Sequence, residues 1–175
     1  MYRSRIKCNN HSVIVVLHSK NLKILRMDIK QLYKKTILEH NRNPRNYGRP
    51  DSFTHKAEGL NAICGDQVFI FISIDGGVIR QMNFDGESCA ISTASASLMT
   101  EFLTGKTVYE ATSLFTDFCL LMDKKSSVDS IKSLGEVNNM AGVKNFPARI
   151  KSATLCWYAM NAALLGNETA TTESL

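Results

Sequence analysis

Two cysteines and an aspartate near the middle of the sequence have the types and the spacing of a metal or sulfur site. Cys64 and Asp66 flank Gly65, which permits a tight turn between a soft and a hard ligand and leaves room for a bound group. Cys89 opens a predicted helix, whose positive end favours the thiolate that binds metals and attacks sulfur. A tetrahedral Zn²⁺ ion or an iron–sulfur cluster needs three or four such ligands.

The spacing is also compatible with an ordinary interior, in which two buried cysteines lie beside a turn aspartate. No Cys-x-x-Cys pair is present to decide between these interpretations. The five cysteines are an odd number and no secretory hydrophobic segment accompanies them, which favours a reduced, cytoplasmic protein over a disulfide framework. The apolar run 13–17 is too short to cross a membrane.

A predicted hairpin positions the candidate ligands. Residues 67–74 and the mixed run 78–84 have the composition of strands, and the Asp-Gly-Gly sequence between them is typical of a hairpin turn. Antiparallel pairing sets Asp66 roughly opposite Gly86. The two thiols and the carboxylate are therefore expected at one end of the sheet.

Helical patterns before and after the hairpin predict an α+β fold in a single domain. The hydrophobic content of 44% supports one core in a chain of this length. A weak edge strand is expected over residues 53–60. Helices are expected after a cap at Asp28, over Ala90–Thr104, after the capping box Thr107–Glu110, and after Phe146-Pro147.

The net charge of +5 belongs to the first 26 residues and not to the domain. All six charged residues before Asp28 are basic, which leaves 15 basic and 16 acidic residues in the remainder. Because no basic patch interleaved with aromatic residues occurs there, nucleic-acid binding is not expected. Residues 1–26 are expected to be a disordered basic extension, either an upstream start of the reading frame or a targeting arm. Residues 27–166 form the predicted domain, and 167–175 a disordered tail.

Several short motifs carry a resemblance to a known family. They are Leu32-Tyr33-Lys34-Lys35, Glu39-His40, Asn43-Pro44-Arg45-Asn46, Cys64-Gly65-Asp66, Gly86-Glu87-Ser88-Cys89-Ala90-Ile91-Ser92, Ala94-Ser95-Ala96-Ser97 and Phe146-Pro147-Ala148-Arg149-Ile150-Lys151. Over about residues 28–165 the sequence resembles the IscU/NifU-like iron–sulfur scaffold family. Its Phe-Pro-Ala-Arg sequence and the polar stretch inserted before the last helix resemble the SufU branch.

The resemblance implies a small three-stranded antiparallel sheet covered by helices on one side, as in the NifU N-terminal or IscU fold. It implies an exposed site at the end of the sheet, with Cys64, Asp66 and Cys89 as metal ligands. In SufU-type proteins the site typically holds Zn²⁺ and a cysteine corresponding to Cys64 accepts persulfide sulfur, whereas IscU-type proteins build a [2Fe–2S] cluster. The implied partners are a PLP-dependent cysteine desulfurase and apo iron–sulfur acceptor proteins.

The implied function is therefore an iron–sulfur cluster assembly scaffold or sulfur acceptor. Whether the protein also has zinc-dependent sulfurtransferase activity stays open. Two alternatives stay open as well. One is a metal-free binding protein that docks the desulfurase and regulates it, and the other is a domain that zinc merely stabilises.

The sequence departs from the family at the third cysteine. That cysteine directly follows Arg-Ile-Lys in the family, where this chain has Ser152, and Cys156 stands one helical turn further on. One turn displaces a side chain by about 5.4 Å, more than twice a Zn–S bond of about 2.3 Å. Three outcomes stay open: Cys156 reaches the metal through a register change, Ser152 or water completes a weaker site, or the chain has lost the metal.

Overall fold

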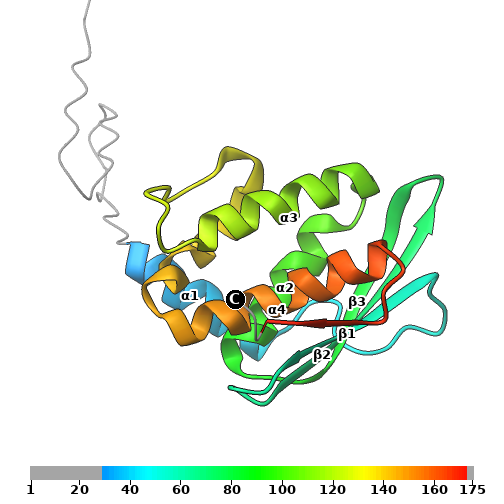
Figure 1. The fold of residues 1–175 in the computed structure, drawn as a ribbon, viewed down its shortest axis with the longest axis horizontal. Helices are drawn as coiled ribbons and strands as arrows, with labels where there is room; N and C mark the ends of the chain where they lie inside the picture. Colours follow the sequence, from blue (N-terminus) through cyan, green and yellow to red (C-terminus); the bar gives the residue numbers. More distant parts are fainter. Residues whose placement is uncertain (1–28, 173–175) are drawn as a thin grey trace, which may run out of the picture.

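The computed structural model describes residues 29–172, and it describes side chains from residue 35 onward. The expected extension over 1–26 and the expected cap at Asp28 lie outside these residues. Figure 1 shows the elements in chain order, which are α1 (Ile29–Arg42), β1 (His55–Asn61), β2 (Asp66–Asp75), β3 (Val78–Glu87), α2 (Ala90–Leu103), α3 (Val108–Met122), the 3-10 helix η1 (Lys132–Asn145), α4 (Pro147–Leu164) and β4 (Thr169–Thr171).

β2 and β3 form the hairpin that the Asp-Gly-Gly sequence predicts. Both glycines of its turn have positive φ (57° and 74°), as the favoured two-residue hairpin turn requires. Val68 and not Asp66 lies opposite Gly86, so the predicted register is two residues in error. One residue comes from the turn, because Asp75 pairs with Val78 and only the two glycines form the loop. The other comes from an irregularity between Ser73 and Ile74, which leaves no clear mark in the sequence.

The sheet is mixed and has four strands in the order β3-β2-β1-β4, which corrects the expected three-stranded antiparallel sheet. β1 pairs antiparallel with β2 and parallel with β4, so it lies inside the sheet and not at its edge. The backbone N–H of Glu58 donates to the carbonyl of Glu168 at 2.8 Å, and Thr172 is buried.

The segment after Gly166, expected as a disordered tail, therefore contributes β4. Gly166 has a φ of 77° and reverses the chain after α4, which returns it to the free side of β1. This pairing is a tertiary contact between distant segments, and three residues are too few to give a strand pattern of their own.

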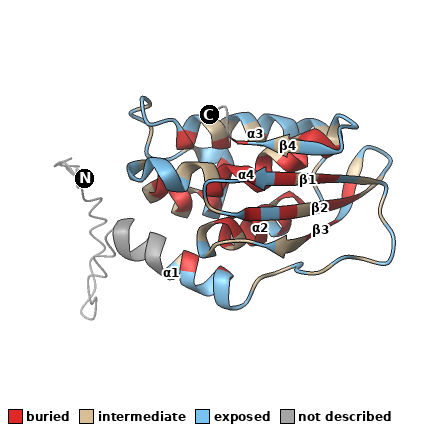
Figure 2. Ribbon diagram, turned by 60° about the horizontal axis from the view of Figure 1, so that its bottom comes forward, coloured by how far each residue is buried: buried red, intermediate tan, exposed pale blue. Residues whose placement is uncertain are grey.

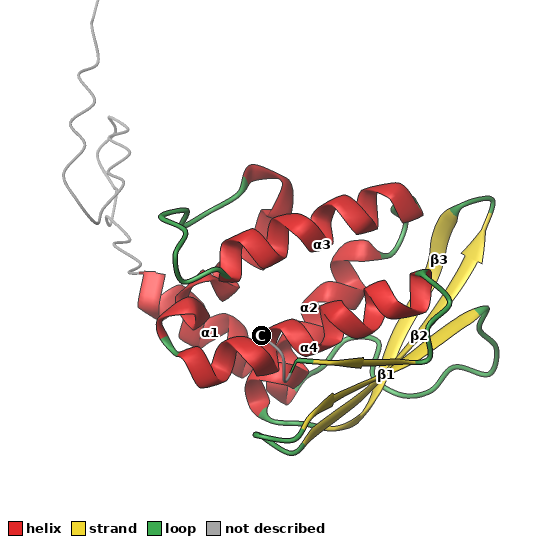
Figure 3. Cartoon of the chain, in the orientation of Figure 1, coloured by secondary structure: helices red, strands yellow, loops and turns green. Residues whose placement is uncertain are grey.

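The helices pack on the sheet in layers (Figures 2 and 3). α4 lies against β1 and β2, α2 lies against β3, and α3 contacts α4 from outside. Gly59 of β1 allows α4 to approach closely, since a Cβ there would lie 3.1 Å from the side chain of Leu155. On another side of α4 the buried ring of Trp157 stacks on Phe118 of α3, with ring centroids 4.3 Å apart. The sheet and α3 together hold α4 in one register.

Two loops close the outer edge of β3. The backbone N–H of Gly48 donates to the carbonyl of Phe84 at 2.8 Å, and the N–H of Phe84 donates to the carbonyl of Asn46 at 3.0 Å. Near the turn, the N–H of Ile79 donates to the carbonyl of Lys106 at 2.8 Å. An open edge strand is a template for pairing with another chain, so these bonds protect the sheet against edge-to-edge association.

The buried side chain of His40 ties α1 to α2. Its Nδ1 lies 2.8 Å from the hydroxyl of Ser97, and the same hydroxyl accepts the backbone N–H of Arg45 at 2.8 Å. Burial lowers the pKa of His40 below its ordinary value, and the nearby charge of Arg45 lowers it further. The neutral ring is therefore the form that fits this junction.

We expect Gly86→Ala to destabilise the fold strongly. Gly86 has a φ of 120°, and a Cβ there would lie 2.2 Å from the carbonyl oxygen of Gln67 in the paired strand. Strain and clash together are expected to lower the free energy of unfolding by about 2–4 kcal/mol in a urea titration. Gly48→Ala is the matched control, because Gly48 also has positive φ but has open space around it. Equal losses in the two variants would contradict this account.

Acidification is expected to destabilise the protein through His40. The unfolded histidine titrates near its ordinary pKa of about 6.5, and the folded one titrates lower, so the unfolded state binds more protons between the two values. The contribution is fully present above pH 6.5 and is lost as the pH falls below it, by at most about 1.4 kcal/mol per pH unit. Unfolding titrations of wild type and His40→Gln at pH 7 and pH 5 measure this. A pH dependence that is the same in both proteins would contradict it.

Candidate metal centre

The predicted ligands come from three neighbouring points at one end of the sheet. Cys64 lies in the loop between β1 and β2, Asp66 is the first residue of β2, and Cys89 immediately precedes α2. Asn61, the last residue of β1, pairs with Asp66 across the sheet, so the loop that carries Cys64 is only four residues long. Gly65 has a φ of 70°, a left-handed conformation that suits glycine and lets this loop turn.

The carboxylate of Asp66 caps the start of α2. Its Oδ1 accepts the backbone N–H of Cys89 at 2.7 Å, and its Oδ2 lies 3.8 Å from the Sγ of Cys89, at the distance of a weak thiol hydrogen bond. Asp66 is 2% exposed, so it is nearly shielded from water. A negative charge at a helix N-terminus is favourable because the first N–H groups of a helix lack partners within it. The structure thus brings Asp66 and Cys89 into direct contact.

Asn61 belongs to the same cluster, although the sequence analysis did not single it out. Its Nδ2 donates to Oδ2 of Asp66 at 3.3 Å and to the Oγ of Ser152 at 3.4 Å. Asn61 is 1% exposed and Ser152 is fully buried. Asn61 lies at the end of a strand in which buried and exposed side chains alternate, at a position that the alternation places inside. A buried polar side chain there needs hydrogen-bond partners, and this could have pointed to Asn61.

Cys64 and Cys89 are each partly exposed free thiols. They therefore differ from an interior pair of cysteines, because reagents from solvent can reach both. Within the described part of the chain, no three His, Cys, Asp or Glu side chains lie close enough together to hold a metal ion. The contact that the structure records is between Asp66 and Cys89, with Cys64 on the adjoining loop.

Cys156 lies elsewhere. It is fully buried in α4, where its Sγ donates to the Oγ of Ser95 at 3.5 Å and to the carbonyl of Ala153 at 3.8 Å. Burial raises the pKa of this thiol to about 12, so at neutral pH it is uncharged and a poor metal ligand. The structure brings Ser152, and not Cys156, to Asn61 and Asp66. A role for Cys156 as ligand would require α4 to change its register.

The donor types at this end of the sheet fit zinc. Two thiols and a carboxylate are ligands that Zn²⁺ accepts, and a site with three protein ligands leaves a fourth position for water or substrate. Ser152 stands where a third thiol is expected, so these residues offer no more than two sulfurs. An iron–sulfur cluster that is held by thiolates would need further ligands from a partner or a small molecule.

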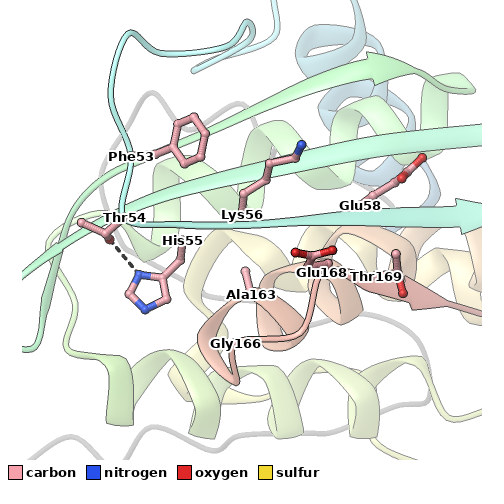
Figure 4. A pocket seen from close by; sticks show the side chains of 9 residues that line it. All are labelled: Phe53, Thr54, His55, Lys56, Glu58, Ala163, Gly166, Glu168 and Thr169. Atoms are coloured by element: carbon pink, nitrogen blue, oxygen red, sulfur yellow. Dashed lines mark hydrogen bonds between the residues drawn. The ribbon is translucent and has the colours of Figure 1, made fainter.

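A pocket at the opposite end of β1 is unrelated to this cluster. Figure 4 shows that it lies between the start of β1 and the turn after α4, with His55, Glu58, Ala163 and Glu168 among its lining residues. None of the described residues that line it is a cysteine. Among the helices that the structure describes, none combines the length and the apolar character needed to cross a membrane.

Comparison with known proteins gives a consistent result. The family model of the NifU-like N-terminal domain matches residues 32–153. The zinc-dependent sulfurtransferase SufU of Bacillus subtilis (strain 168) is 40% identical over 138 residues, which cover 78% of this chain and 92% of SufU. The iron–sulfur cluster assembly scaffold protein IscU of Thermotoga maritima is 36% identical over 138 residues, which cover 79% of this chain and 96% of IscU.

Solved structures share the fold. A candidate iron–sulfur cluster assembly scaffold protein for the SUF system of Fervidobacterium islandicum AW-1 superposes with a TM-score of 0.70 at 32% identity, covering 76% of this chain and 96% of that one. A NifU-like N-terminal protein of Brucella abortus has the same TM-score at 21% identity, over 79% of this chain and 95% of that one. With a family model that spans well over half of the chain and a fold that agrees with it, this protein belongs to the family of the NifU-like N-terminal domain.

Proposed function

We propose that the protein is an iron–sulfur cluster assembly scaffold and sulfur acceptor that works with a cysteine desulfurase. The observation that carries the proposal is the contact between Asp66 and Cys89, together with the partly exposed Cys64, which precedes Asp66 by two residues. The identity of 40% to a zinc-dependent sulfurtransferase supports it. Cluster recipients would be apo iron–sulfur proteins.

Cys64, Asp66 and Cys89 are the residues that would hold Zn²⁺ or the iron of a [2Fe–2S] cluster. A bound cation would favour the thiolate form of both cysteines at neutral pH. For Cys64 to join the pair, its loop has to close toward Asp66. Gly65, the residue between them, has a φ of 70°, a conformation that glycine adopts readily. The fourth position would be taken by Ser152, by water, or by incoming sulfur.

Sulfur transfer to Cys64 is a thiol–disulfide type of exchange. The Cys64 thiolate attacks the outer sulfur of the persulfide on the desulfurase, a new S–S bond forms, and the bond inside the donor persulfide breaks. The desulfurase cysteine leaves as a thiolate and Cys64 becomes a persulfide, so no external oxidant or reductant is consumed. The partial exposure of Cys64 on a short loop supplies the access that this attack needs.

Asp66 would give the site an oxygen ligand that exchanges more readily than a thiolate. In the structure both of its oxygens accept hydrogen bonds from the protein, one from the Cys89 amide and one from Asn61. Releasing a metal or a cluster from Asp66 therefore returns the carboxylate to partners that are already in place. A site of four thiolates would bind more tightly and release its cargo more slowly.

A second candidate function is that of a metal-free protein that docks the desulfurase and regulates it. The observation that favours it is the hydroxyl of Ser152 at the place where a third thiol is expected. Fewer thiolates weaken a site for zinc or iron. Metal content distinguishes the two functions.

Purified anaerobically under reducing conditions, the protein is expected to contain one equivalent of zinc, or iron together with sulfide. Incubated with desulfurase and cysteine, it is expected to gain one sulfur atom on Cys64 by peptide mass spectrometry. Cys64→Ser should abolish this gain, because it removes the attacking thiolate. Cys119→Ser is the matched control, since burial raises the pKa of that thiol in α3. A protein that takes up no metal and no sulfur but still binds the desulfurase would establish the second function.

Ser152→Cys is expected to raise the affinity for zinc at least about 10-fold, because it adds a thiolate next to Asn61 and Asp66. Competition with a chromophoric chelator measures the change. Cys156→Ser is expected to leave the zinc affinity unaltered, since the Cys156 thiol is hydrogen-bonded to Ser95 and stays protonated. A loss of zinc affinity in Cys156→Ser would instead show that α4 changes its register when metal binds.

A further inference from the structure

We propose that Asn61 is a positioning residue, which holds the Asp66 carboxylate against the start of α2 and so sets the orientation of Cys89. This inference deepens the proposed function, because it concerns the same site. It rests on hydrogen bonds that the protein makes without any metal, so it can be tested separately from metal binding.

The side chain of Asn61 donates both to the carboxylate of Asp66 and to α4. Its Nδ2 lies 3.3 Å from Oδ2 of Asp66 and 3.4 Å from Oγ of Ser152. These contacts connect the end of β1, the start of β2 and the second turn of α4. The other oxygen of Asp66 accepts the Cys89 N–H at 2.7 Å. The side-chain amide of Asn61 therefore connects β1, β2 and α4, and through Asp66 it connects them to the start of α2.

Burial makes these contacts specific. Asn61 is 1% exposed and Asp66 2%, so water has little access to replace a lost bond. A buried carboxylate that loses a hydrogen-bond donor is costly, and it would turn toward solvent or toward another donor. Either movement would release the Cys89 amide from Oδ1. The position of the carboxylate therefore depends on the amide of Asn61.

The carbonyl oxygen of Asn61 supports a functional explanation over simple packing. Asn61 Oδ1 is buried and has no hydrogen-bond partner among the described residues. A buried acceptor without a partner costs free energy, and a leucine of similar size at the same place would avoid that cost. The amide is thus a poor choice for the core but a suitable donor to Asp66.

The test uses the zinc-free protein and follows hydrogen exchange of the Cys89 backbone amide by NMR. Asn61→Leu keeps the branched shape and the number of side-chain heavy atoms and removes the donor. We expect the Cys89 amide to exchange at least about 10-fold faster in this variant, as it should in Asp66→Ala, which removes the acceptor itself. In the double variant the two effects should not add, because both remove the same hydrogen bond.

Two controls separate positioning from a general loss of stability. Ser97→Ala removes a buried hydroxyl of α2 that bonds to His40 and Arg45 on the side facing α1, and it should leave the Cys89 amide protected. Exchange of the amides within β2 reports global opening in each variant. Asn61→Ala serves as a second variant in case the leucine side chain prevents folding.

An unchanged exchange rate of the Cys89 amide in the Asn61 variants, beside a faster rate in Asp66→Ala, would overturn the inference. So would equal acceleration of all amides. Zinc affinity, measured on the same proteins, is expected to fall about 10-fold in Asn61→Leu, with no further loss on the Asp66→Ala background. A wild-type protein that binds neither zinc nor persulfide sulfur would refute the proposed function, while the exchange result would still decide the role of Asn61.

Discussion

The buried carboxylate of Asp66 is the constraint on which the candidate site depends. It must accept hydrogen bonds because water hardly reaches it, and the donors come from the first amide of the Cys89–α2 junction and from Asn61. The hairpin, the short β1–β2 loop and the start of α2 can satisfy it only when they meet at one point. The same arrangement leaves both nearby thiols partly exposed. The arrangement that satisfies the hydrogen bonds of Asp66 is therefore also the one that leaves the two thiols accessible.

Local patterns predicted the elements that carry the site, and tertiary contacts account for what they missed. The Asp-Gly-Gly turn and the Thr107–Glu110 capping box are both present, because each is stabilised within a few residues. The parallel pairing of β4 with β1 joins segments about a hundred residues apart, and nothing local indicates it. Asn61 was missed for a similar reason. Its role follows from Ser152 and Asp66, which only the folded chain brings to it.

Ser152 and Cys156 show how one helical turn separates two chemical environments. The hydroxyl reaches the cluster at the end of the sheet, whereas the thiol lies between α4 and α2 and bonds to Ser95. Exchanging Ser152 and Cys156 would therefore change both the ligand atoms available at the site and the polarity of the interface between α4 and α2. The chain therefore leaves the thiols of Cys64 and Cys89 partly exposed and buries the thiol of Cys156 as an internal contact.

The stacking of Trp157 on Phe118 has a practical consequence for spectroscopy. Trp157 is the only tryptophan in the sequence, and it is fully buried one residue after Cys156. Its emission therefore reports the environment of α4 alone, without any introduced label. If the helix slid to carry Cys156 toward the sheet end, the indole would leave its aromatic neighbour and its fluorescence maximum would move. A steady emission spectrum during metal loading would indicate that the helix keeps its place.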